Sequence, residues 1–258
     1  MLSYQHIYHA GNLADVHKHS LLSWMLNQLI QKDKPLTYVE SHAGRALYYL
    51  DAAEALKTGE AAQGIDRAEA LNWFSDAHPY AKTIQATHSE HGENAYPGSP
   101  MIASKILRPT DKMHLAELHP QEFSALDYAL PMAKCYQQDG FEMAQSISPP
   151  TPRRGMLLID PSYEIKTDYD FIPGQIAALH RKWNVGIIML WYPILVDAPH
   201  RQMLTALTKA HPDALRHEVR FPPARAGHRM VGSGLFFLNP PYLIEEETSR
   251  LDKHFAKL

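Results

Sequence analysis

The chain of 258 residues lacks several features that mark common protein classes. Its one cysteine, Cys135, excludes an intramolecular disulfide and a cysteine-based metal cluster, as is usual in a reducing cytosol. No apolar run approaches the roughly 18 residues of a membrane span, and the first residues lack the basic and apolar regions of a signal peptide. We therefore expect a cytoplasmic protein that makes no contact with a membrane.

A strong charge of one sign is also absent. The formal net charge is -3, which excludes a uniformly basic nucleic-acid binder but leaves room for a local basic patch. The glycine fingerprint of dinucleotide-binding proteins, a phosphate loop and a Ser/His/Asp hydrolase set are missing too. With 45% hydrophobic residues, the chain can still bury a sizeable core.

Apolar runs and helical patterns alternate along the chain. Seven runs predict strands, at residues 36–40, 113–118, 133–137, 156–159, 185–191, 215–221 and 234–238. The segments between and beyond them have helical periodicity, at residues 14–31, 99–107, 121–130, 168–183, 199–210 and 245–258. This alternation predicts an α/β fold with a sheet of seven strands.

The interval between the first two predicted strands is unusually long. A strand–helix–strand unit takes about 30 residues, and residues 40–113 are more than twice that. The excess, at about 50–96, contains helical stretches near 66–74 and 79–91. We predict one domain over residues 1–258 with a helical insertion, which either packs as scaffold or faces the substrate; we favour substrate contact.

The most informative stretch is the apolar run 156–159, because it ends in Asp160-Pro161-Ser162-Tyr163. Ligands of open α/β sheets bind at the carboxyl ends of the strands. There, Asp160 and the carbonyl of Pro161 could each accept a hydrogen bond from the exocyclic amine of adenine, and Tyr163 could stack on the base. The alternative is structural: Asp160 caps a helix and Pro161 begins a turn.

Polar candidates also follow the first three strands. The turn that contains Gly44 lets the backbone approach a ligand closely. Glu117 could accept both hydroxyls of a ribose, and Asp139-Gly140 could hold the amine and ring of a cofactor adenine. Taken singly, these are equally a solvated acid and a plain turn. Together with Asp160 they have the layout of a Rossmann-like S-adenosylmethionine-dependent methyltransferase.

Basic residues could supply the local patch that RNA needs. Arg225 and Arg229 lie in a Pro- and Gly-flanked segment, and Arg153 and Arg154 precede the fourth strand. We favour RNA phosphate contact over a solvated protein face. A histidine cluster near the start could suggest a metal site, but no carboxylate or cysteine set accompanies it, so we predict none; its members are His6, His9, His17 and His19.

Ordered motifs over nearly the whole chain resemble the RlmJ family, bacterial methyltransferases of the adenine N6 amine in 23S ribosomal RNA. They include His9-Ala10-Gly11-Asn12, Tyr96-Pro97-Gly98-Ser99-Pro100, Asp139-Gly140-Phe141, Ile159-Asp160-Pro161, Leu190-Trp191-Tyr192-Pro193 and Asn239-Pro240-Pro241. The resemblance implies S-adenosylmethionine as cofactor and 23S rRNA as partner, and we expect a monomer.

The resemblance also implies residue roles. Asp160 would be the catalytic acceptor, Tyr4 would contact the RNA, and Lys18 would lie beside the cofactor. The implied cofactor site consists of His19, His42, Ser99, Glu117, Asp139, Gly140 and Asp160.

The sequence departs from the family pattern at two positions. Ser162 replaces the second proline of Asp-Pro-Pro-Tyr, and Ala46 replaces a second glycine in the first loop. These departures leave open a non-catalytic nucleic-acid-binding protein, and similar sequences are linked to the use of external DNA. A DNA adenine methyltransferase is a second alternative, because such enzymes use the same kind of tetrapeptide as Asp160-Pro161-Ser162-Tyr163.

Overall fold

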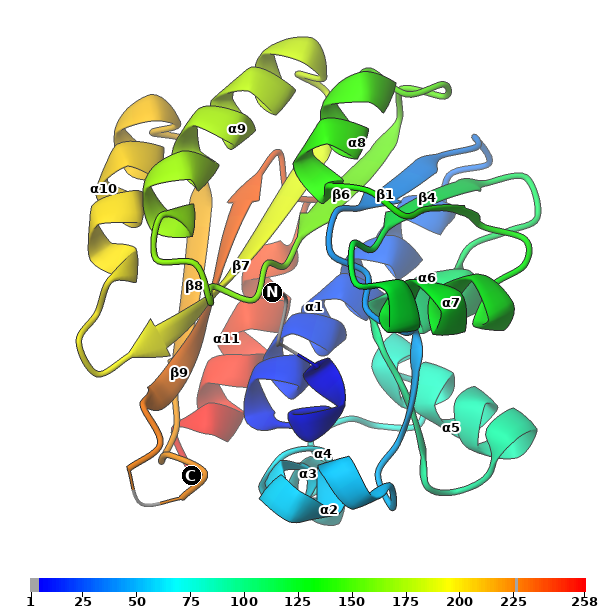
Figure 1. Ribbon diagram of the computed structural model, residues 1–258, viewed down its shortest axis with the longest axis vertical. Helices are drawn as coiled ribbons and strands as arrows, with labels where there is room; N and C mark the ends of the chain where they lie inside the picture. Colours follow the sequence, from blue (N-terminus) through cyan, green and yellow to red (C-terminus); the bar gives the residue numbers. More distant parts are fainter. Residues whose placement is uncertain (1–4, 226) are drawn as a thin grey trace.

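Seven strands form one sheet in the order β5-β4-β1-β6-β7-β9-β8 (Figure 1). The computed structural model describes residues 5–225 and 227–258. Only β9 runs antiparallel to its neighbours β7 and β8, whereas the other pairs are parallel. The strands are β1 (Thr37–Glu40), β4 (Lys112–Ala116), β5 (Lys134–Tyr136), β6 (Gly155–Ile159), β7 (Ile187–Leu195), β8 (Leu215–Arg220) and β9 (Met230–Leu238). The predicted seven-stranded α/β fold is confirmed.

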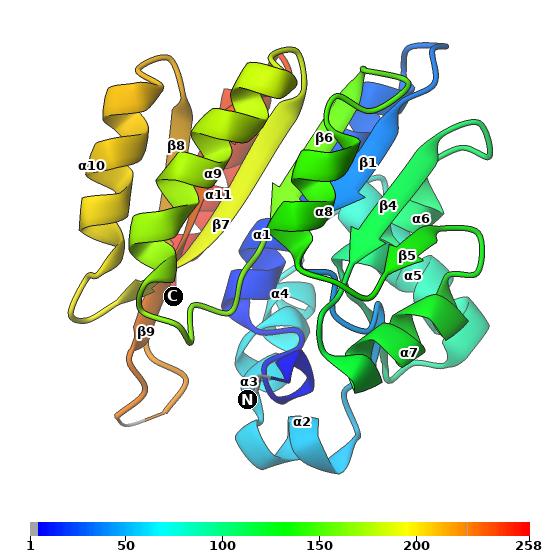
Figure 2. The ribbon, with the colours of Figure 1, turned by 45° about the horizontal axis from the view of Figure 1, so that its top comes forward.

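Both faces of the sheet are buried, which explains why its central strands read as continuous apolar runs. On β6, Met156 and Leu158 join one core cluster, whereas Leu157 and Ile159 join the other. Figure 2 shows the second face covered by α8 (Gly140–Ile147), α9 (Asp168–Lys182) and α10 (His200–Ala210). The first face is covered by α1 (Leu13–Ile30), α6 (Ser99–Ile106) and α11 (Ile244–Phe255), while α7 (Pro120–Ala129) packs near β5.

The strand order changes direction at β1. From β1 the chain continues to β4 and β5 on one side, and then returns to β6 on the other side. In doubly wound sheets such a switch point opens a crevice at the carboxyl ends of the strands, where ligands bind. The ends of β1 and β6, at Glu40 and Ile159, therefore define the expected place of the site.

The segment between β1 and α6 contains four helices and a small hairpin. The helices are α2 (Ala53–Thr58), α3 (Glu60–Gln63), α4 (Ile65–Ala70) and α5 (Pro79–His91), and β2 (Leu47–Tyr49) pairs antiparallel with β3 (Ala95–Pro97). In both ribbon views α2, α3 and α4 lie together beyond the carboxyl ends of β1 and β6 (Figures 1 and 2). The sequence did not predict the hairpin, because strands of three residues are too short for a periodic pattern.

Helix α1 carries polar side chains into the core. Asn12 caps it by accepting a hydrogen bond from the backbone N–H of Asp15 at 2.9 Å. Asp15, Lys18 and His19 are all nearly completely buried on this helix, and their spacing brings them to one face. A short 3-10 turn, η1 (His6–Tyr8), precedes the helix. Within the described residues, no helix combines the length and the apolar character needed to cross a membrane.

Candidate active site

A cavity of about 700 Å³ opens at the carboxyl edge of the sheet, at the switch point beside β1 and β6. Its wall comes from α1, from the loops after β1, β4, β5 and β6, and from the loop between β8 and β9. Every predicted site residue that the structure describes lines it: Lys18, His19, His42, Gly44, Ser99, Glu117, Asp139, Gly140, Asp160, Pro161, Tyr163, Arg225 and Arg229. Tyr4 lies outside the described residues.

Asp160 forms an ion pair at the centre of this wall. Its Oδ2 atom lies 2.5 Å from Nζ of Lys18, and the same ammonium lies 3.1 Å from Oδ1 of Asp15. Burial alone would lower the pKa of Lys18, but the two carboxylates outweigh burial and hold that pKa above its ordinary value. Asp160 makes no helix cap, since α9 begins after Thr167. Its carboxylate instead faces the cavity with a fixed counter-ion.

The Asp160-Pro161-Ser162-Tyr163 segment is held in place by its last residue. Tyr163 adopts a left-handed backbone conformation with a φ of 55°, and its hydroxyl donates to the carbonyl of Trp191 at 2.8 Å. The ring packs against that of Tyr169, with centroids 4.7 Å apart. Tyr163 is therefore held as a rigid wall of the cavity, while Ser162 beside it is exposed.

The loops after β1 and β4 are tied together at the other end of the cavity. The carboxylate of Glu117 accepts hydrogen bonds from the backbone N–H groups of Gly44, at 2.8 Å, and His119, at 2.7 Å. Burial raises the pKa of Glu117 against these bonds. Each carboxylate oxygen keeps a lone pair, so the group can still accept a ligand hydroxyl.

Asp139 and Gly140 begin helix α8, a helix that the sequence did not predict. Oδ1 of Asp139 caps the helix by accepting from the N–H of Glu142 at 2.9 Å. A Cβ atom on Gly140 would lie 1.7 Å from the carbonyl oxygen of Ser41. Gly140 is thus required for close packing between α8 and the loop after β1, and Asp139 retains one oxygen for a ligand.

The two predicted histidines are neutral. Burial lowers the pKa of His42 to about 4 although Asp160 and Asp139 oppose it. Burial also lowers the pKa of His19 to about 3; Asp15 opposes this, whereas Lys18 adds to it. Both rings therefore present uncharged polar atoms, and Nδ1 of His19 bonds to the hydroxyl of Tyr96 at 2.9 Å.

Sequence reasoning missed Glu40, which the structure places behind the cavity. Its buried carboxyl accepts hydrogen bonds from Tyr38, at 2.7 Å, and from Ser99, at 2.5 Å. Burial raises the pKa of Glu40 to about 8, so the group is largely protonated at neutral pH. The signal was its position at the end of the first strand, one residue before the predicted turn.

Asp15 was also missed, although its spacing gave a signal. It lies three residues before Lys18 and four before His19, which places all three on one helix face. Its Oδ2 atom lies 2.8 Å from His6 and accepts from the backbone N–H of Gly11 at 3.0 Å. Asp15 thereby links the segment before α1 to the Lys18–Asp160 pair.

Comparisons with known proteins match this chain to one family. The family model described as "Ribosomal RNA large subunit methyltransferase D, RlmJ" matches residues 33–258. The chain is 35% identical to ribosomal RNA large subunit methyltransferase J of Escherichia coli, over 97% of this chain and 91% of that protein. It is 34% identical to the protein of the same name from Haemophilus influenzae, over 100% of this chain and 94% of that protein.

The chain belongs to the RlmJ family. A crystal structure of a Legionella pneumophila protein, 33% identical, superposes with a TM-score of 0.85 over 96% of this chain and 93% of that one. RlmJ proteins are methyltransferases, and S-adenosylmethionine is their methyl donor. The predicted family, enzyme class and cofactor are thereby confirmed.

The cavity fits such a donor. An adenosine moiety needs hydrogen-bond acceptors for its ribose and amine, and Glu117 and Asp139 both have free acceptor capacity beside Gly44 and Gly140. Nδ1 of His119, another lining residue, is buried without a hydrogen-bond partner. A polar ligand would satisfy this atom, because a buried polar group without a partner is unfavourable.

Ala46, one of the two departures from the RlmJ pattern, keeps the backbone that glycine favours. It is completely buried, with a φ of 67°, and its carbonyl accepts from the N–H of Gly98 at 2.7 Å. A left-handed conformation costs a residue with a Cβ atom about 1–2 kcal/mol. The loop conformation is therefore retained at some cost in stability.

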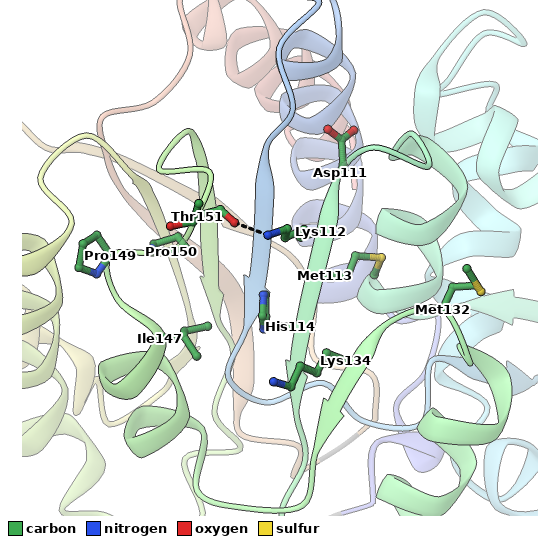
Figure 3. A pocket seen from close by; sticks show the side chains of 10 residues that line it. All are labelled: Asp111, Lys112, Met113, His114, Met132, Lys134, Ile147, Pro149, Pro150 and Thr151. Atoms are coloured by element: carbon green, nitrogen blue, oxygen red, sulfur yellow. Dashed lines mark hydrogen bonds between the residues drawn. The ribbon is translucent and has the colours of Figure 1, made fainter.

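Some candidates from the sequence lie elsewhere. Arg154 donates to the backbone carbonyls of Leu29 and Lys34 beside the amino end of β6, and Arg153 next to it donates to Oδ1 of Asn184 at 3.4 Å. Neither arginine lines the cavity. A second, open pocket of about 510 Å³ lies near the start of β4, and its lining residues are drawn in Figure 3. There, Nζ of Lys112 donates to the carbonyl of Thr151 at 2.7 Å. None of the predicted site residues lines that pocket.

The early histidines form hydrogen bonds with several different elements. His6 pairs with Asp15, His9 with Glu60, and His17 with Ser233 and His217. Over residues 5–225 and 227–258, no group of three or more His, Cys, Asp or Glu side chains is arranged to hold a metal ion.

Proposed function

We propose that this protein transfers a methyl group from S-adenosylmethionine to the N6 amine of an adenine in 23S ribosomal RNA. The observation that supports the proposal is that Asp160 and Pro161 line the same cavity as the carboxylates of Glu117 and Asp139, which could accept hydrogen bonds from an adenosine. Membership of the RlmJ family supports ribosomal RNA as the substrate. An adenine would be flipped out of its stack to reach this depth.

The chemistry would depend mainly on orientation of the amine. The bound donor supplies an electrophilic methyl group on a sulfonium. Asp160 would accept a hydrogen bond from one N–H of the amine, and the carbonyl of Pro161 would accept one from the other N–H. These two bonds would localise the nitrogen lone pair for attack on the methyl group. Nζ of Lys18, 2.5 Å from Oδ2 of Asp160, holds that carboxylate in place. Asp160 would also take the proton that the amine loses after transfer.

We assign the remaining lining residues to the two ligands. The donor would be held by Lys18, His19, His42, Gly44, Ser99, Glu117, Asp139, Gly140 and Asp160, and the target adenine would stack on Tyr163. Arg225 and Arg229 in the loop between β8 and β9, with Tyr4, would contact the RNA. Arg229 pairs with Asp197 at 2.5 Å, but both side chains are more than half exposed, so the pair would exchange readily for a phosphate.

We further propose that residues 1–258 form one methyltransferase domain, in which residues 50–96 are a helical insertion beside the substrate. The enzyme would act as a monomer in the cytoplasm. The insertion is joined to the cavity by Glu60, whose carboxylate accepts from Asn12 at 3.0 Å and pairs with His9.

Two experiments test the substrate. Deproteinised 23S rRNA from cells lacking this protein should become labelled at adenine N6, and naked adenine-containing DNA should not; labelling of DNA alone would favour a DNA methyltransferase. Absence of both donor binding and labelling would favour a non-catalytic nucleic-acid binder.

The RNA surface can be tested separately. Replacing both Arg225 and Arg229 with alanine should raise KM for rRNA and leave donor affinity unchanged. The slope of log affinity for rRNA against log salt concentration should fall by the amount expected for about two lost phosphate contacts. Arg181→Ala combined with Lys209→Ala is the matched control, because these two exposed basic residues in the last turns of α9 and α10 do not line the cavity. Equal effects of the two variants would contradict the assignment.

A further inference from the structure

A continuous chain of buried hydrogen bonds joins the cavity wall to the surface of helix α11. The indole Nε1 of Trp191 donates to Oγ of Ser233 at 2.9 Å, and that oxygen lies 2.9 Å from Nδ1 of His17. Nε2 of His17 lies 2.9 Å from Nδ1 of His217, whose Nε2 lies 3.0 Å from Oδ1 of Asp252. The chain thus crosses β7, β9, α1, β8 and α11.

The acceptor at the surface end fixes the direction of the bonds in this chain. Burial lowers the pKa of His17 and His217, so each ring is neutral at neutral pH and has one donor and one acceptor nitrogen. The carboxylate of Asp252 can only accept, so Nε2 of His217 donates to it and Nδ1 of His217 accepts from Nε2 of His17. Nδ1 of His17 then accepts from the hydroxyl of Ser233, whose oxygen accepts from the Trp191 indole. One tautomer set satisfies all four bonds.

The interior of the chain is shielded from solvent. His17 and Ser233 have no exposed surface, His217 is 7% exposed, and only the terminal Asp252 side chain is largely exposed, at 59%. The rings of His217 and Phe255 also enclose His17, at centroid distances of 5.0 and 5.9 Å. Hydrogen bonds in such surroundings are directional and hold side chains in one orientation.

Trp191 is the end of this hydrogen-bond chain that lies at the candidate active site. Its ring lines the cavity, lies 5.7 Å from Nζ of Lys18 and 6.1 Å from the ring of Tyr163. Tyr163 also donates to the backbone carbonyl of Trp191. The indole therefore lies close to both the Lys18–Asp160 pair and Tyr163, the groups that would hold a flipped base.

We propose that Ser233, His17, His217 and Asp252 are positioning residues that fix the Trp191 indole against the target adenine. The inference rests on the proposed function, because it assigns Trp191 a part in holding the base. It adds to that function a series of hydrogen bonds that orients Trp191 and begins at the protein surface, at Asp252. Asp252 is more than 60 residues from Trp191 in the amino-acid sequence.

The indole N–H resonance of Trp191 is the direct test, and it needs neither RNA nor activity. Among the four tryptophans, the Trp191→Phe variant identifies the signal in a ¹H–¹⁵N spectrum. His217→Phe, which keeps an aromatic side chain and removes both ring nitrogens, should move this signal. Asp252→Ala should move it in the same direction, and this variant is expected to fold normally because Asp252 is exposed. Glu246→Ala, an exposed acid of the same helix, should leave the signal in place.

Kinetics then show whether the enzyme uses this support. His217→Phe should lower kcat/KM for rRNA about tenfold with donor Kd unchanged, because a misplaced base loses near-attack geometry. In a Trp191→Phe background His217→Phe should cause little further loss. Tyr192→Phe, next to Trp191 on β7, removes a part-buried hydrogen bond to Glu218 on β8; this variant controls for stability and should keep kcat/KM.

Each outcome decides the proposal. An unmoved indole signal in both His217→Phe and Asp252→Ala would overturn the chain. A moved signal with unchanged kcat/KM would overturn its positioning role. Absence of rRNA methylation by the wild-type enzyme, with the signal moving as expected, would refute the proposed function and the base-holding role of Trp191 but not the chain itself.

Discussion

The Lys18 ammonium is the element of the site whose removal has the most calculable effect. Lys18→Met preserves the length of the side chain and removes its charge. Two carboxylates, Asp15 and Asp160, then lose a partner at 3.1 and 2.5 Å, and Lys18 and Asp15 are nearly completely buried. At an effective dielectric constant of about 20, the shorter contact alone corresponds to about 7 kcal/mol of Coulomb attraction.

Desolvation of the charges offsets much of that attraction in the wild type. The net expectation is a loss of about 3–5 kcal/mol in the free energy of unfolding, as is usual when one partner of a buried pair is removed. Asp160→Asn in the Lys18→Met background should recover part of the loss, because one uncompensated charge disappears. The two substitutions are therefore expected to be non-additive.

Chemical denaturation at pH 7, followed by circular dichroism, measures these differences. Lys105→Met is the control, since Lys105 pairs with the largely exposed Glu90 at 2.8 Å and should lose less than about 1 kcal/mol. A loss in Lys18→Met no greater than in Lys105→Met, or simple additivity with Asp160→Asn, would refute the view that the pair is electrostatically coupled.

Two further predictions concern packing and protonation. Gly140→Ala should abolish donor binding or destabilise the protein by several kcal/mol, because its Cβ would meet the Ser41 carbonyl. Gly174→Ala is the control and should have neither effect, because there is open space around Gly174. Equal thermal stability of the two variants would be inconsistent with the close packing at Gly140. The pKa of Glu40 is raised to about 8, so folding favours its neutral form, and its contribution is present at low pH and lost as pH rises from about 4.5 through 8. Glu40→Gln should remove this decline in thermal melts between pH 6 and 9, whereas a Glu40→Gln curve parallel to wild type would exclude a shifted Glu40.

The strand-end residues were predictable because two general rules converge on them. Apolar runs located the strands, and the rule that ligands bind at their carboxyl ends selected Glu117, Asp139 and Asp160. Gly140 was chosen as room for a ligand, but the structure shows that its hydrogen faces the Ser41 backbone. The residues at the ends of strands can therefore be predicted from the sequence, whereas the groups that each of them contacts cannot.

Long-range polar contacts were beyond sequence reasoning. His17 falls inside an apolar helical pattern, and its partners His217 and Ser233 are 200 and 216 residues away in the chain. Glu40 ends a buried strand and gives no sign that Tyr38 and Ser99 will share its carboxyl. Such groups are identified only when the topology brings distant elements together, because their residue types are equally common on the surface.

Methyl transfer by matched enzymes tests the central claim most directly. Tritiated S-adenosylmethionine and 23S rRNA from cells lacking this protein would be incubated with wild type and with Asp160→Ala, and the donor affinity of both would be measured. The account predicts label as N6-methyladenine with wild type, and none with Asp160→Ala although the variant remains folded. Full turnover by Asp160→Ala would contradict the account.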